Sequence, residues 1–236
     1  MSGVSFTPRD ADSHPPFIDP DYKSTGLRGP TKPLIPLKHS ASETTGPLYG
    51  HEAVSGLDND LTRNGVKNGE VIGERINVAG QVLDELGRPV ANSLVEVWQC
   101  NAAGRYIDDN DRHDAPLDPN FYGGGRCVTD ENGVYRFRTI RPAAYPWGNH
   151  PNAWRPGHIH FSLFGAGLAS RLITQMYFPG DPLIRHDPIA QATPSEAIDR
   201  LIARFSLEET EPDTALGFVF DIVLRGPKET PMENRP

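Results

Sequence analysis

Two histidines in the second half of the chain have the type and the spacing to share one metal ion. They lie in segment 156–163, Pro-Gly-His-Ile-His-Phe-Ser-Leu, which alternates apolar and polar residues as a β-strand does. Side chains alternate across a strand, so His158 and His160 would share one face, opposite the apolar side chains. Imidazole is a common metal ligand. The pair is compatible with a metal site and also with two partly buried polar residues.

Two tyrosines follow predicted strands earlier in the chain. Tyr106 ends the segment Asn-Ala-Ala-Gly-Arg-Tyr, and Tyr145 lies in a proline-bracketed loop, Arg-Pro-Ala-Ala-Tyr-Pro-Trp. Residues just after strands are held by a rigid scaffold and can be aimed into a site. Either tyrosine taken singly could equally be an aromatic side chain that packs on its own loop.

The elements that must position these residues are mainly strands. Short runs with alternating or continuous apolar character are separated by turns such as Asp-Glu-Leu-Gly-Arg-Pro and Asp-Glu-Asn-Gly. Strand, turn and strand at this spacing predict a β-sandwich of mixed or antiparallel strands. The predicted strands cover residues 76–82, 94–100, 127–129, 134–140, 158–163, 171–178 and 216–224.

One short helix is predicted near residues 194–205. Thr193 is a candidate N-cap, Pro194 stands at the first helical position and Glu196 completes a capping box. Ile198, Leu201, Ile202 and Phe205 then recur at helical spacing.

Residues 1–70 differ in composition from the rest of the chain. They are polar and interrupted by prolines, yet they carry apolar residues such as Phe17, Tyr22, Leu34, Ile35 and Leu37. A disordered tail would need fewer such anchors. We therefore expect an N-terminal arm over 1–70 that packs on the core and on a partner subunit, and a β-sandwich domain over 71–236.

Overall composition limits the class of protein. The chain has 236 residues, a net charge of −8 and a pI near 5.5, which argues against nucleic acid as a partner. No apolar run approaches membrane-spanning length, and the first residues contain no apolar signal core. The only cysteines, Cys100 and Cys127, make neither a disulfide framework nor a CxxC metal motif. These features predict a reduced, cytoplasmic setting.

Three segments together resemble a known family. The run Val-Glu-Val-Trp-Gln-Cys-Asn-Ala-Ala-Gly-Arg-Tyr at 95–106, Tyr145-Pro146, and Arg-Pro-Gly-His-Ile-His at 155–160 are similar to the signature of the intradiol ring-cleavage dioxygenases. The spacings between the segments fit as well, and the likeness runs from about Gly73 to the last predicted strand. The resemblance implies a transthyretin-like β-sandwich with one non-haem Fe³⁺ per chain and no organic cofactor.

The resemblance also implies a ligand set. Tyr106 and His158 would be equatorial ligands of the iron, and Tyr145 and His160 axial ligands. Two phenolates and two imidazoles form a hard donor set that favours the ferric state, whereas thiolate-rich sites favour zinc or Fe–S clusters. A ferrous site of two histidines and one carboxylate fits less well, because no Asp or Glu has a place in the pattern.

Further roles are implied by the same family. Tyr145 would leave the metal when a catechol binds and act as a base, and Arg155 would stabilise negative charge on the ring. Gln175 would donate or accept a hydrogen bond near substrate or O₂, although it could be an ordinary polar strand residue. Substrate contacts are implied for Tyr22, Trp147, Arg155 and Ile189, and Trp98 would pack against the pocket wall.

The segment Tyr-Lys-Ser-Thr-Gly-Leu-Arg-Gly-Pro at 22–30 resembles those family members that act on protocatechuate, 3,4-dihydroxybenzoate. Such members pair an iron-bearing β subunit with a homologous α subunit in αβ protomers of a larger oligomer. The resemblance implies cleavage of protocatechuate with O₂ to 3-carboxy-cis,cis-muconate, a step of aromatic catabolism in the β-ketoadipate pathway. Two alternatives stay open: a catechol or hydroxyquinol 1,2-dioxygenase, and a non-catalytic transthyretin-like binding module.

Overall fold

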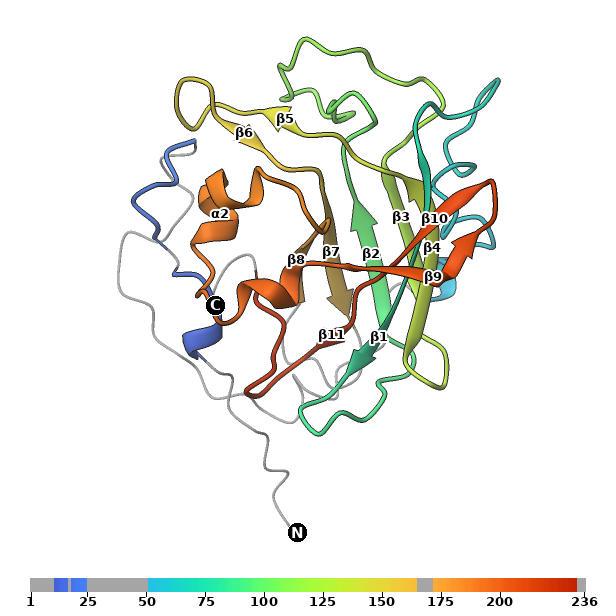
Figure 1. The fold of residues 1–236 in the computed structure, drawn as a ribbon. Coiled ribbons are helices and arrows are strands. Elements are labelled where there is room, and N and C mark those ends of the chain that lie inside the picture. Colours follow the sequence, from blue (N-terminus) through green and yellow to red (C-terminus); the bar gives the residue numbers. More distant parts are fainter. Residues whose placement is uncertain (1–10, 17, 25–50, 165–171, 233–236) are drawn as a thin grey trace.

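The alternating strands form two packed β-sheets, as predicted (Figure 1). The structure is a computed structural model and describes residues 11–16, 18–24, 51–164 and 172–232. Its strands are β1 (Arg75–Leu83), β2 (Leu94–Trp98), β3 (Gly124–Val128), β4 (Val134–Ile140), β5 (Tyr145–Pro146), β6 (Trp154–Arg155), β7 (His158–Phe164), β8 (Leu172–Tyr177), β9 (Arg204–Glu211), β10 (Ala215–Val219) and β11 (Ile222–Val223).

One sheet has the order β11-β1-β10-β9, with β4 also pairing to β1, and the other has the order β3-β2-β7-β8. Strand β1 runs parallel to β10 and β11 and antiparallel to β4, so the sandwich is mixed. Strands β3 and β4 flank the predicted turn at 130–133 but belong to different sheets. The turn therefore carries the chain from one sheet to the other, and Asp130 Oδ1 accepts hydrogen bonds from the backbone of Asn132 and Val134.

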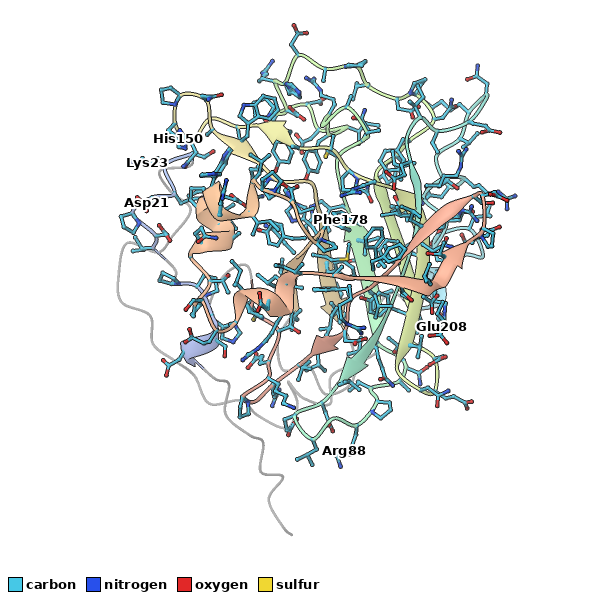
Figure 2. The ribbon with its side chains drawn as sticks, in the orientation of Figure 1. Asp21, Lys23, Arg88, His150, Phe178 and Glu208 are labelled. Atoms are coloured by element: carbon cyan, nitrogen blue, oxygen red, sulfur yellow. The ribbon has the colours of Figure 1, made fainter. Side chains whose placement is uncertain are left out.

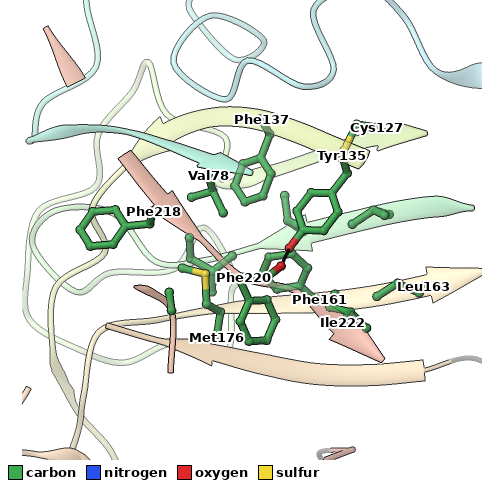
Figure 3. Close-up of a cluster of buried hydrophobic side chains, with 14 of the residues drawn as sticks. Val78, Cys127, Tyr135, Phe137, Phe161, Leu163, Met176, Phe218, Phe220 and Ile222 are labelled. Carbon is green, nitrogen blue, oxygen red and sulfur yellow. Dashed lines mark hydrogen bonds between the residues drawn. The ribbon is translucent and has the colours of Figure 1, made fainter. Parts of the chain in front are cut away.

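Aromatic and aliphatic side chains from both sheets fill the space between them (Figure 3). The ring of Phe161 on β7 lies 5.8 Å from that of Phe137 on β4 and 5.2 Å from that of Phe220. Ile159, Phe161 and Leu163 are all fully buried in this core, and each such side chain contributes about 1.5–3 kcal/mol to folding. The apolar face of β7 thus anchors the strand that carries the two histidines.

Two sequence predictions for the C-terminal part need correction. The helix expected near 194–205 is not formed: only η4 (Ile198–Leu201) is helical there, as a 3-10 turn, and β9 begins at Arg204. Ile202 forms a bridge with Tyr177 of β8, and the amide of Ala203 donates to the Tyr177 carbonyl at 2.9 Å. This pairing holds the backbone extended and ends the helix. The α-helix lies earlier, as α2 (Pro188–Gln191), after the 3-10 turn η3 (Ile184–His186).

The strand predicted over 216–224 is divided into β10 and β11, which pair with successive parts of β1. Strand β9 was not predicted. Its apolar residues are spread among charged ones, and Phe205 and Leu207 are exposed. The strand is specified by its antiparallel pairing with β10, which the local pattern does not show.

Parts of the N-terminal arm contact the sandwich. Residues 11–13 form the 3-10 turn η1 (Ala11–Ser13), and another turn, η2 (His51–Ala53), precedes the first strand. His14 lies buried beside Glu229, with 3.3 Å between Nε2 and Oε1, and its Nδ1 accepts a hydrogen bond from the amide of Met232. The predicted anchors Phe17, Leu34, Ile35 and Leu37 lie outside the described residues. The division at residue 70 stays a prediction.

Two further observations concern the predicted setting. Cys100 and Cys127 are free thiols and both are buried. In the part of the chain that the structure describes, no helix has the length and apolar character to cross a membrane.

Candidate active site

The two histidines occupy the first and third positions of β7, at one end of the four-stranded sheet. His160 pairs with Trp98 of β2 on one side and with Gln175 of β8 on the other. His158 pairs with Tyr177 of β8. Cross-strand neighbours project to the same face, so all five side chains share the face of the sheet opposite the core. The sequence pattern predicted this orientation for the histidines, and the burial of Ile159, Phe161 and Leu163 confirms it.

His158 is fully buried and held in one tautomer. Its Nδ1 lies 2.7 Å from the carbonyl oxygen of Pro156, which can only accept, so Nδ1 carries the proton and Nε2 keeps its lone pair as an acceptor, facing Arg155 Nη1 at 3.1 Å. That Nε2 lies 3.2 Å from Nε2 of His160. Burial, together with the nearby Arg155 and His160, holds the pKa of His158 well below its ordinary value. A neutral imidazole with its second nitrogen hydrogen-bonded to a backbone carbonyl is the form that binds metals.

Tyr106 is positioned by the loop that follows β2. Asn101 organises this loop: its Oδ1 accepts from the amides of Ala103 and Arg105, each at 2.9 Å. Gly104 has φ +78°, and a Cβ there would lie 2.6 Å from the carbonyl oxygen of Ala144. Only glycine allows so close an approach. The loop can therefore rest against the segment that carries the second tyrosine.

Tyr145 lies on the short ribbon of β5 and β6, directly opposite Arg155. The guanidinium Nη1 donates to the Tyr145 hydroxyl at 3.4 Å and to Nε2 of His158 at 3.1 Å. Burial raises the pKa of Tyr145, and Arg155 opposes that shift. The ribbon thus brings the tyrosine and a permanent positive charge to the same side of the histidines.

The four aromatic rings converge. Ring centroids lie 5.4 Å apart for Tyr106 and Tyr145, 5.7 Å for Tyr145 and His158, and 6.4 Å for Tyr106 and His160. The hydroxyl of Tyr106 is buried and has no hydrogen-bond partner among the described residues. Burial and the neighbouring Tyr145 raise the pKa of Tyr106 well above its ordinary value. A buried phenol without a partner is unfavourable, and a bound cation would relieve that cost by holding the phenolate.

These residues therefore fit a hard trivalent cation. A metal lowers the pKa of ligands that must lose a proton, so it would reverse the effect of burial on both phenols. Within the described ranges, no three His, Cys, Asp or Glu side chains are grouped as a metal site.

Arg155, three residues before His158, is the centre of a buried polar network. Its Nη2 donates to Gln175 Oε1 at 2.6 Å and to Asp187 Oδ2 at 2.9 Å. Burial disfavours the charged guanidinium, but Asp187, Tyr177 and Tyr145 outweigh it and raise the pKa of Arg155. The guanidinium is thus a fixed positive charge beside the tyrosine and histidine rings.

Sequence analysis missed Asp187 and Tyr177. Asp187 is fully buried, and besides pairing with Arg155 it accepts from the Tyr177 hydroxyl and from the backbone amide of Ile189, each at 3.3 Å. Because its side chain accepts a hydrogen bond from the amide of Ile189, Asp187 is the N-cap of α2. A signal was present, because an Asp directly before Pro188 is a typical N-cap. Nothing local indicated that the same carboxylate pairs with an arginine 32 residues earlier.

The remaining predicted residues lie around this network. Gln175 accepts from Arg155 and from the Tyr177 hydroxyl, and its Nε2 is buried without a partner in the described part of the chain. Ile189 is half-buried at the start of α2. Trp98 stacks on His160, with 4.8 Å between ring centroids and an interplanar angle of 2°. Trp98 thus packs against a candidate metal ligand.

Tyr22 and Trp147 are brought together from distant parts of the sequence. Their ring centroids lie 5.4 Å apart, and the Arg155 guanidinium lies 5.6 Å from the centre of the Trp147 ring. The arm residue, the tryptophan and the arginine thus form one continuous wall. This arrangement places Tyr22 at the edge of the site.

The predicted site residues therefore gather in one region. Two phenols and two imidazoles converge, with a fixed cation, a buried amide and an aromatic wall beside them. Such a group can bind a hard metal ion, an anion and a planar ring next to one another.

Comparison with known proteins agrees with this chemistry. A family described as "Dioxygenase" matches residues 44–226, and one described as "Protocatechuate 3,4-dioxygenase beta subunit N terminal" matches residues 7–40. The protocatechuate 3,4-dioxygenase beta chain of Burkholderia cepacia is 66% identical over 232 residues, which are 98% of this chain and 99% of that protein.

More distant relatives share the domain but are longer. Hydroxyquinol 1,2-dioxygenase of Rhizobium sp. is 34% identical over 62% of this chain, which spans 50% of that protein. The crystal structure of 3-chlorocatechol 1,2-dioxygenase from Rhodococcus opacus 1CP superposes with a TM-score of 0.56 at 27% identity, covering 72% of this chain and 65% of that one. The chain therefore belongs to the intradiol ring-cleavage dioxygenase family, in its protocatechuate 3,4-dioxygenase β-chain branch.

Proposed function

We propose that this chain is the iron-bearing β subunit of an enzyme that cleaves protocatechuate with O₂ between its two hydroxyl-bearing carbons. The product would be 3-carboxy-cis,cis-muconate. The observation that carries the proposal is the convergence of two phenols and two imidazoles beside a buried arginine. The 66% identity to a protocatechuate 3,4-dioxygenase beta chain supports the choice of substrate.

Tyr106, Tyr145, His158 and His160 would hold the ion as Fe³⁺. When bound there, Fe³⁺ would supply Lewis acidity, which lowers the pKa of its phenol ligands and of a bound catechol. Tyr145 lies within reach of the Arg155 guanidinium, at 3.4 Å. Its phenolate could therefore accept a proton from a substrate hydroxyl, and the adjacent positive charge would stabilise the phenolate before the transfer and the substrate oxyanion after it.

The other residues would orient and stabilise the substrate. Arg155 is locked by Asp187 and Gln175, so its charge is already aimed when the ring becomes anionic. Tyr22 and Trp147 form an aromatic wall against which a planar ring can pack. Ile189 would fill the same wall from α2, and Gln175 has an unused buried amide that can donate to substrate or O₂.

We also propose that the chain works with a homologous α subunit in αβ protomers, and that the N-terminal arm takes part in that contact. The name of the Burkholderia cepacia relative, a beta chain, supports a companion chain. The buried free thiols of Cys100 and Cys127 fit the reducing cytoplasm in which we place the enzyme.

The test is purification from the native host followed by iron analysis, a visible spectrum and O₂ uptake. We expect about one iron per chain, an absorption band from ferric phenolate, and faster O₂ uptake with protocatechuate than with catechol or hydroxyquinol. His160→Ala should lose the iron and the colour, whereas the exposed His150→Ala should keep both. A colourless, iron-free protein from iron-replete cells would leave only a non-catalytic binding role. Turnover of catechol but not of protocatechuate would show that protocatechuate is not the substrate.

A further inference from the structure

Asn149 lies in the loop between β5 and β6 and binds the N-terminal arm. Its side chain is buried, and its Oδ1 accepts from the backbone amides of Lys23 at 2.5 Å and Ser24 at 3.1 Å. Its Nδ2 donates to the carbonyl of Asp21 at 2.9 Å. One amide side chain thus binds three backbone groups of the arm. Figure 2 shows the labelled Asp21 and Lys23 beside His150, the residue that follows Asn149.

The residue between these contacts is Tyr22. Asp21 and Lys23 are both bound to Asn149, so the backbone on either side of Tyr22 is fixed. Tyr22 is half-buried, and its ring meets that of Trp147, two positions before Asn149. Lys23 and Ser24 are exposed, so the segment brings little apolar burial of its own to this contact. Asn149 has a backbone partner for its oxygen and for its nitrogen, so it constrains the segment through hydrogen bonds.

The same connection also holds residues of the site. Tyr145 and Arg155 face each other across β5 and β6, and Trp147 donates its amide to Ala153 at 3.1 Å within the loop. Asn149 is therefore built on the same rigid ribbon as a candidate metal ligand and the buried arginine. Any movement of the arm relative to the site must break its hydrogen bonds.

We infer that Asn149 is the positioning residue that sets Tyr22 against Trp147, and that through this contact the arm segment 21–24 shapes the side of the site against which an aromatic substrate packs. This inference rests on the proposed function. Asn149 itself does not touch the reacting atoms. It acts through Tyr22, which is supplied by a segment more than 120 residues away in the sequence.

The first test measures whether Asn149 holds the arm segment 21–24, and it does not depend on catalysis. Hydrogen–deuterium exchange of the Tyr22–Ser24 peptide is compared in the full-length chain and in Asn149→Ala. The amides of Lys23 and Ser24 should exchange at least about tenfold faster in the variant, because both lose their buried acceptor. Exchange in β7 should not change. His150→Ala, an exposed change in the same loop, is the control and should leave the peptide protected. Unchanged exchange in Asn149→Ala would show that Asn149 does not hold the arm segment.

The second test measures substrate binding in the complete enzyme. Asn149→Ala should lower kcat/KM for protocatechuate by about tenfold, mostly through KM, where tenfold corresponds to about 1.4 kcal/mol. In a Tyr22→Ala background the same change should add less than about twofold, since its effect passes through Tyr22. A loss in kcat with KM unchanged, or full additivity with Tyr22→Ala, would show a merely structural residue.

Asn149→Asp provides a second variant in case the alanine change prevents folding. It keeps acceptor oxygens for Lys23 and Ser24 but loses the donation to Asp21, so we expect exchange and KM values between those of the parent and Asn149→Ala. Failure of the parent to turn over protocatechuate would overturn the proposed function, and with it the claim that the arm shapes substrate binding. The exchange experiment would still decide whether Asn149 holds the arm.

Discussion

At the scale of single residues, two functional side chains are held by neighbouring groups that have no direct role in the chemistry. His158 is fixed by the carbonyl of Pro156, and Arg155 is fixed by Asp187. These supports decide which atoms carry protons and where the positive charge lies. Changes at the candidate ligands and at their supports should therefore have different signatures.

Tyr145→Phe tests the part proposed for the second phenol. The ring and its packing remain, but the hydroxyl that lies 3.4 Å from Arg155 is lost. We expect iron to stay bound through the other three side chains, the visible absorption to weaken, and substrate binding in stopped-flow measurements to slow by about 10²-fold, the lower end for loss of a general base. Binding kinetics equal to those of the parent would refute the role of Tyr145 as a base.

Asp187→Asn tests the support of Arg155. The change leaves a fully buried guanidinium without its anionic partner, which costs about 3–5 kcal/mol when the pair is buried. We expect lower stability in urea titrations and a fall in kcat/KM of about 10²-fold as the charge loses its fixed direction. The control is Glu70→Gln, which breaks the exposed pair with Arg75 and should cost less than about 1 kcal/mol.

At the scale of elements, loops and short ribbons complete what the strands begin. Strand β7 supplies both histidines, but the tyrosines come from the loop after β2 and from β5. These pieces meet because glycines permit close backbone contact. The contact between Gly104 and Ala144 is therefore a place where a small substitution should disturb the site.

Gly104→Ala should disturb that contact. The residue has φ +78°, and its new Cβ would lie 2.6 Å from the Ala144 carbonyl oxygen. We expect the Tyr106 loop to shift, with iron affinity falling at least about tenfold while the circular dichroism spectrum of the sandwich is kept. Gly87→Ala is the matched control, because Gly87 has φ +75° but nothing within 4 Å of the new Cβ. Equal effects of the two changes would mean that backbone strain alone is responsible.

The segment before β1 is attached to β3 through Asp58. Hydrogen bonding by Ser55 lowers the pKa of Asp58, burial opposes this and Arg126 adds to the lowering. A lowered folded-state pKa means that the stabilisation is complete above the ordinary value and is lost as the pH falls through the lowered one. Asp58→Asn should therefore cost about 1 kcal/mol at neutral pH and nothing once the carboxyl of the parent is protonated. Urea titrations across the acid range measure this, and a cost that persists in acid would contradict it.

At the scale of the whole molecule, the described residues between 11 and 24 of the arm are fixed to the sandwich at two distant places. Residues 21–24 bind Asn149, and His14 binds the C-terminal segment at Glu229 and Met232. Arg200 strengthens the second place by donating to Ser13 and to the Glu229 carbonyl. The arm is thus part of the folded unit, at least where the structure describes it.

His14→Ala should loosen the second attachment. The change removes the acceptor of the Met232 amide and the imidazole beside the buried Glu229, so we expect a loss of about 2–3 kcal/mol in unfolding free energy. Calorimetry and urea titration measure it, with the exposed His186→Ala as control. A loss no larger than that of the control would show that this contact contributes little.

The sequence by itself determined most of the fold and the identity of the candidate ligands. Alternation along 156–163 assigned the two histidines to one face, and glycine-containing turns marked the strand ends, because these signals are local and set by backbone geometry. Strands β1, β2, β3, β4 and β7 were predicted within a few residues for the same reason, whereas the two-residue strands β5 and β6 were not predicted. The family signature then joined Tyr106 and Tyr145 to the histidines.

Only the tertiary structure decided what depends on distant partners. The segment after Thr193 had the pattern of a helix, but pairing with Tyr177 made residues 202–203 extended. Asp187 was marked locally only as an N-cap, and its pairing with Arg155 had no signal. The contacts of Tyr177 with Asp187 and of Asn149 with Asp21 had none either, since the partners lie 10 and 128 residues away. Buried polar groups must find partners wherever the chain passes. Those choices fix the direction of Arg155 and the place of Tyr22, and they follow from the packing of the whole molecule.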